Sequence, residues 1–165
     1  MKRRLDFVSN SSSSSYIIIS HTKGELEDFS DFQNSDGYYE VPNRDHGRYQ
    51  FDWQFINTND FFGKLNFCAM QCFYSKNFDN YFNMLKRVVK NNFNLNIKMC
   101  HLTQQEYNGN VYKDLPSDCY IDHQSCATEG ACMDMFKDED TLLKFLSNSD
   151  SMIVGGNDND SQFYD

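Results

Sequence analysis

The sequence contains no hydrophobic run long enough to cross a membrane, because a spanning helix needs about 18 consecutive apolar residues. It begins with Met1-Lys2-Arg3-Arg4, but polar Ser9 to Ser15 stand where a secretory signal would carry its apolar stretch. We therefore expect no membrane segment and a cytoplasmic location, with the six cysteines as reduced thiols.

Positive charge is also scarce. The chain has 15 Lys and Arg residues against 24 Asp and Glu residues, which gives a net charge of -9. Nucleic-acid affinity depends largely on Lys and Arg that neutralise phosphates, so direct nucleic-acid binding is not expected. The acidity fits a partner protein with a basic surface, or solubility alone.

Familiar catalytic motifs are missing as well. There is no Gly-x4-Gly-Lys-Ser/Thr loop to cradle phosphates, and no Gly-x-Ser-x-Gly elbow to raise a serine as a nucleophile. No internal repeat is visible, so a repeat architecture is not expected. The sequence thus points to no particular reaction.

What is present fits one globular domain. The chain has 165 residues, of which 16% are aromatic, and this supplies large buried areas. We predict a single α+β domain over 1–155, with a mixed α/β fold as the alternative, followed by an acidic tail over 156–165. The sheet is expected to be mixed or antiparallel, with about three helices.

The helices are predicted from apolar periodicity and capping residues. They cover 60–75 with Asp60 as the cap, 77–90, and 138–146 with an acidic cap. Strands are predicted over 16–19, 37–41, 48–56, 94–101, 119–124 and 151–155. We expect 37–41 and 48–56 to form a hairpin, and the segment with Gly109 and Pro116 to be a loop.

Five consecutive serines precede the first predicted strand: Ser11, Ser12, Ser13, Ser14 and Ser15. Serine hydroxyls bond to nearby backbone groups and favour turns over regular ladders. We interpret the block as an exposed polar loop that leads into the first strand, with recognition as its expected role and a purely structural role as the alternative. The C-terminal Asp158 and Asp160 carry oxygen ligands of the type that Ca²⁺ or Mg²⁺ prefers, but the pattern of an EF-hand loop is incomplete, so we interpret the segment as a turn and tail.

One cluster has the residue types of a zinc site: Cys119, His123, Cys126 and Cys132. Its spacing lacks the Cys-x2-Cys knuckle of most structural zinc sites. Buried cysteines also serve as small core residues, so we expect no cofactor and keep zinc as the alternative.

A catalytic reading centres on "IDHQS". His123 and Ser125 would share one face of a strand, and Cys126 would supply a thiolate if its pKa were lowered. These three residues are candidates for a small metal-dependent or cysteine hydrolase. A hydrogen-bonded, inert histidine is the simpler interpretation.

Three segments carry a resemblance: "FVSNSSSSSY", "YIDHQS" and "SMIVGGNDND". They resemble segments of short, mostly uncharacterised proteins from bacteriophages and other mobile elements of AT-rich bacteria. The resemblance implies a setting, that of a phage or prophage accessory protein. Together with the small size, the acidity and the lack of a coherent catalytic set, it leads us to expect a protein that binds a host protein, such as an inhibitor of bacterial defence of the anti-CRISPR type. A structural component of the virion is the other possibility that it leaves open.

Overall fold

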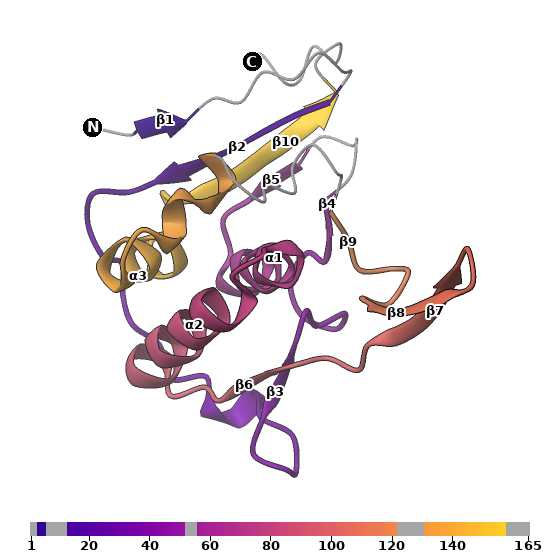
Figure 1. Ribbon diagram of the computed structural model, residues 1–165. Helices are drawn as coiled ribbons and strands as arrows, with labels where there is room; N and C mark the ends of the chain where they lie inside the picture. The colour runs from indigo at the N-terminus through magenta and orange to yellow at the C-terminus, as the bar shows by residue number, and fades with distance from the viewer. Residues whose placement is uncertain (1–2, 6–12, 52–55, 122–130, 158–165) are drawn as a thin grey trace.

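The central sheet is antiparallel and has the strand order β1-β2-β10-β5. Its strands are β1 (Arg3–Leu5), β2 (Ser13–Ile19), β5 (Ile56–Thr58) and β10 (Met152–Asn157). The architecture comes from a computed structural model that describes residues 3–5, 13–51, 56–121 and 131–157 (Figure 1). The first and last parts of the described chain therefore meet in the middle of one sheet.

Three α-helices lie on one side of this sheet (Figure 1). They are α1 (Phe61–Tyr74), α2 (Phe78–Phe93) and α3 (Glu139–Ser147). Asp60 caps α1 by accepting a hydrogen bond from the Gly63 backbone N–H at 2.7 Å, and Asp138 caps α3 through Thr141 at 2.7 Å. All three helices are thus confirmed where periodicity and caps predicted them.

The core is built around α1, which is buried on all sides. Ten successive residues, Gly63 to Cys72, are buried, so the helix has no polar face. In contrast, α2 is amphipathic and buries a stripe of apolar residues: Phe82, Leu85, Val88, Val89 and Phe93. A central helix with a sheet on one side and a second helix beside it gives a single α+β domain, as predicted.

The predicted hairpin between 37–41 and 48–56 is wrong. Strand β3 (Tyr39–Val41) pairs in parallel with β6 (Ile97–Met99), and β4 (Gln50–Phe51) pairs in parallel with β9 (Tyr120–Ile121). The two segments expected to pair with each other therefore belong to different small sheets.

A buried asparagine explains this separation. The Asn66 side chain in α1 donates to the carbonyls of Asn43, His46 and Arg48 at 2.9, 3.0 and 3.1 Å, and its Oδ1 accepts from the Asn43 N–H at 2.8 Å. These bonds fold the connecting loop onto the helix, so it cannot act as a hairpin turn. Gly47 completes the contact, because a Cβ there would lie 2.3 Å from the Gly63 backbone nitrogen.

Two further boundaries differ from prediction. Ser13–Ser15 belong to β2 and do not form an exposed loop, because the register sets Ser15 against Gly155 and Ser14 against Gly156 in β10. Backbone pairing with a neighbouring strand overrides the weak strand preference of serine. By the same pairing, β10 continues through Asn157, so 156–157 extend the sheet beyond the predicted domain end.

Candidate interaction surface

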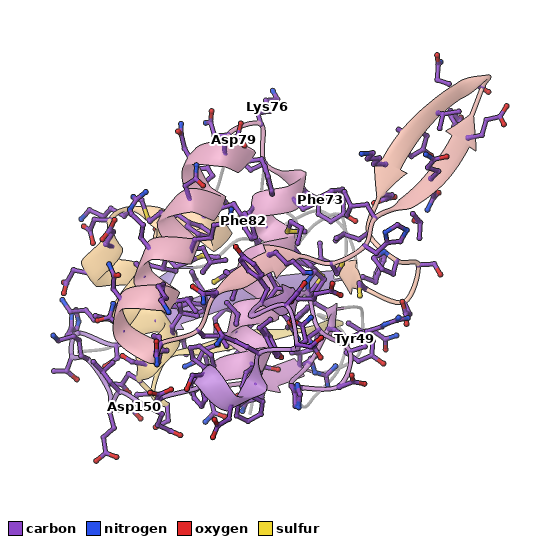
Figure 2. The ribbon with its side chains drawn as sticks, turned by 90° about the horizontal axis from the view of Figure 1, so that it is seen from below. Tyr49, Phe73, Lys76, Asp79, Phe82 and Asp150 are labelled. Atoms are coloured by element: carbon purple, nitrogen blue, oxygen red, sulfur yellow. The ribbon has the colours of Figure 1, made fainter. Side chains whose placement is uncertain are left out.

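A β-hairpin projects from the body of the molecule. It consists of β7 (Thr103–Tyr107) and β8 (Asn110–Asp114), and Figure 2 shows it extending away from the helices and the sheets. Asn108 and Gly109 connect the strands with φ angles of 52° and 77°, as a type I′ turn requires. We predicted a loop here, although Asn-Gly between strand-forming residues is a strong hairpin signal.

The base of the hairpin is fixed to the core, while its tip is free. The Thr103 hydroxyl donates to the carbonyls of Asp114 and Leu115 at 3.3 and 3.2 Å, which locks the two strands together. Leu115 is buried directly after β8, and the Tyr74 hydroxyl of α1 donates to Asp114 at 3.4 Å. The contacts at the base therefore fix the orientation of the hairpin relative to the core.

Large side chains on this hairpin are exposed to solvent. Tyr107 is 67% exposed, Val111 65% and Tyr112 44%. The register pairs Tyr107 with Asn110 and Gln105 with Tyr112, so both tyrosines lie on the same face of the ribbon. We call this surface, made by Gln105, Tyr107, Asn110 and Tyr112, the tyrosine face. Val111 lies on the opposite face.

The composition of the tyrosine face is typical of binding surfaces. Tyrosine provides a large contact area at low conformational cost, and asparagine provides adaptable polar contacts. Because the strands are anchored at their base, the tyrosines are also presented on a fixed scaffold. These features suit recognition of another macromolecule more than catalysis.

A groove of about 700 Å³ lies between the hairpin base and the end of β6. Cys100 and His101 line it together with Glu40, Lys98, Gln104 and Lys113. Burial raises the pKa of the Cys100 thiol to about 11, so this thiol is protonated at neutral pH. The groove therefore offers no thiolate nucleophile.

A second groove, of about 530 Å³, is lined by cations of α2 and β6: Lys86, Arg87, Lys90 and Lys98. Two of these four cations are paired with carboxylates. Arg87 pairs with Glu139 at 2.8 Å, and Lys98 pairs with Asp36 and Glu40. The other two contact uncharged groups: Lys86 lies over the Phe82 ring, and Lys90 donates to the Asn94 side chain.

Two of the three segments with the phage-type resemblance lie side by side. Ser13–Ile18 in β2 pairs residue by residue with Met152–Asn157 in β10. The predicted recognition residues Ser13, Ser14 and Ser15 thus lie in the central sheet. Ser11, Ser12, Asp158 and Asp160 lie outside the described residues.

The predicted zinc and hydrolase sites fall mostly outside the described part of the chain. His123, Ser125 and Cys126 lie outside that part. Cys132 lies in the 3-10 helix η2 (Ala131–Phe136). Cys119 is buried, and burial raises the pKa of its thiol to about 11. Within the described residues, no group of three or more His, Cys, Asp or Glu side chains is arranged to hold a metal ion.

The acidic C-terminal region is largely engaged within the molecule where it is described. Asp138 caps α3, Glu139 pairs with Arg87, and Asp140 pairs with Lys144. Hydrogen bonds from Thr141 lower the pKa of Asp138. These carboxylates are exposed, but each is already bonded within the molecule.

No protein-family model, no curated protein and no solved structure matches this chain. Among the helices that the structure describes, none is both long and apolar enough to cross a membrane. Its function therefore has to be inferred from its own surfaces.

Proposed function

We propose that this chain is a small acidic accessory protein of a bacteriophage or related mobile element that binds a host protein in the bacterial cytoplasm. It acts by protein–protein interaction without catalysis. The specific action that we propose is inhibition of a defence nuclease such as a CRISPR effector. The observation that carries the interaction is the projecting hairpin, with Tyr107 and Tyr112 exposed on one face.

The contact area of the hairpin and the charge of the whole chain support this proposal. Exposed tyrosines on an anchored ribbon resemble the aromatic anchors that contribute most of the energy at protein interfaces. The net charge of -9 favours association with a basic surface, such as the nucleic-acid groove of a nuclease. The setting in a mobile element comes from the sequence resemblance.

The proposal is tested by affinity purification of the tagged chain from a bacterial host. We expect a stoichiometric partner at moderate salt, and we expect the Tyr107→Ala/Tyr112→Ala double variant to bind it at least about tenfold more weakly. Leu26→Ala is the matched control, because Leu26 is 49% exposed but lies in the segment between β2 and η1 (Ser30–Phe32), on the opposite side of the molecule from the hairpin (Figure 1).

A second readout addresses counter-defence. The wild-type chain should restore plaque formation by a phage that a CRISPR nuclease in the host targets, and the double variant should not. Recovery of no stoichiometric partner, or equal binding by the wild type and the double variant, would contradict the proposal.

A further inference from the structure

The hairpin has two strand edges without a neighbour. In the part of the chain that the structure describes, β7 and β8 pair only with each other. Tyr107 and Asn110 flank the two-residue turn and exchange the first hydrogen bonds of the ladder. The next pair, Glu106 and Val111, consequently directs its backbone N–H and C=O groups outward.

This alternation gives each edge a defined set of free groups. Gln104 and Glu106 present theirs along β7, and Val111 and Lys113 present theirs along β8. Such an edge is a template for pairing with another strand. A two-stranded ribbon is also only marginally stable alone, so a third and fourth strand would stabilise it.

We infer that a second copy of this chain pairs with the β8 edge, so that two hairpins form one four-stranded antiparallel sheet in a two-fold dimer. The alternation along β8 allows this arrangement, because its two outward-facing residues lie symmetrically about Tyr112. With Tyr112 on the two-fold axis, Val111 lies opposite Lys113 of the partner subunit, and the outward groups of both residues meet. Tyr112 then faces Tyr112 of the partner subunit as a close cross-strand aromatic pair.

The β7 edge is less suited to the same role. Self-pairing centred on Gln105 would set Glu106 against Gln104 of the partner subunit, with no apolar side chain in either position. In contrast, β8 contributes Val111 and Tyr112, which are 65% and 44% exposed and have a high strand preference. Self-pairing at the β8 edge therefore brings apolar and aromatic side chains into contact, and self-pairing of Gln104 with Glu106 at the β7 edge does not.

The dimer would combine the tyrosine faces of two copies. Tyr107 and Tyr112 lie on one face of each hairpin, so the joined sheet presents four tyrosines on one surface. Binding of a host protein to that surface rests on the proposed function, whereas dimerisation itself does not.

Dimerisation and host binding also differ in their dependence on salt. Two copies with a charge of -9 each repel one another, so added salt tightens the dimer but weakens binding to a basic partner.

Sedimentation equilibrium of the reduced chain at about 50 mM and about 500 mM NaCl tests the inference. We expect a monomer–dimer equilibrium that shifts toward the dimer at the higher salt concentration. Val111→Pro removes one outward N–H from β8 without removing a hydrogen bond of the hairpin, because proline is tolerated where the N–H faces solvent. The dimer dissociation constant of this variant should exceed that of the wild type by at least about tenfold.

Glu106→Pro is the matched control, since Glu106 lies directly opposite Val111 and its N–H faces the other edge. It should dimerise like the wild type. Lys113→Pro and Gln104→Pro form a second matched pair in the same register and guard against local unfolding in one variant. A wild-type chain that stays monomeric at both salt concentrations, or β8 proline variants that dimerise as well as the β7 variants, would overturn the inference. If the chain stays monomeric but still binds a host protein, the dimer is overturned and the proposed function is not.

Discussion

A lysine side chain is costly to bury, and Lys64 is only 1% exposed. Its ammonium donates to the carbonyls of Asn148 and Ser151 at 2.9 and 3.4 Å. Asn148 is the C-terminal cap of α3, so Lys64 satisfies carbonyl oxygens at the negative end of that helix dipole. The residue thus joins the N-terminal part of α1 to the connection between α3 and β10.

Burial lowers the pKa of Lys64 from 10.5 to about 8. Between these values the unfolded chain binds more protons at this position than the folded chain, so the lysine adds stability as the pH rises. We compare the free energy of unfolding of the wild type with that of Lys64→Met. Between pH 8 and 10.5, the difference should shift in favour of the wild type by up to about 3 kcal/mol. Urea unfolding of both proteins at several pH values measures this difference.

Lys76→Met is the control for this comparison, because Lys76 projects into solvent at the turn between α1 and α2 (Figure 2). Its profile should run parallel to that of the wild type. Parallel profiles for Lys64→Met and the wild type would instead show that folding does not lower the pKa of Lys64.

Elements of this molecule differ in how closely they are tied to the core. The loop around Gly47 packs its backbone against the first turn of α1, whereas the turn at Gly109 stands in open space. Both glycines have positive φ angles, of 68° and 77°. They therefore impose a similar backbone requirement in two very different environments.

This contrast predicts two different results for the same substitution. Gly109→Ala should cost about 1 kcal/mol, confined to the hairpin, because only the backbone conformation is strained. Gly47→Ala should cost about 3 kcal/mol or more of global stability, because its Cβ also meets backbone atoms of Gly63 at 2.3 Å. Urea unfolding reports the global effect, and hydrogen exchange of the β7 and β8 amides reports the local one. Equal global losses would show that the hairpin is part of the cooperative core.

The whole molecule combines a net charge of -9 with a core that contains protonated thiols. Exposed carboxylates such as Asp138 and Asp118 have lowered pKa values because they accept hydrogen bonds or ion pairs. Burial raises the pKa values of Cys68 and Cys72 far above 9.0. Acid and alkali therefore act on different parts of the structure.

Stability should accordingly be lost in acid and in alkali, and it should be greatest just below pH 9.0, because Lys64 adds stability above its pKa of about 8 and the thiols act only above 9.0. The lowered carboxyl pKa values contribute stability that is present above 3.8 and lost as the pH falls further. The raised thiol pKa values contribute stability that is present below 9.0 and lost above it, and these thiols together outweigh the opposite effect of Lys64. Thermal unfolding measured from below pH 3.8 to above pH 9.0 should show both limbs, with Asp138→Asn flattening the acid limb and Cys72→Ala the alkaline limb. An alkaline limb unchanged in Cys72→Ala would contradict the assignment.

The sequence by itself determined the three helices and the fold class. Caps such as Asp60 and Asp138 act within one helical turn, and the apolar periodicity of α2 is local, so both are readable along the chain. The Asn108-Gly109 turn was readable in the same way, although we predicted a loop there. Local signals of this kind need no knowledge of distant residues.

Only the tertiary structure decided strand partners and the candidate surface. Ser13–Ser15 became a strand because Gly155, Gly156 and Asn157, more than 130 residues away, pair with them. β3 and β4 separated because one buried side chain, Asn66, bound the loop between them. The exposure of Tyr107 and Tyr112 likewise depends on how the body folds away from the hairpin. Backbone pairing and burial are set by long-range contacts, which a linear pattern does not specify.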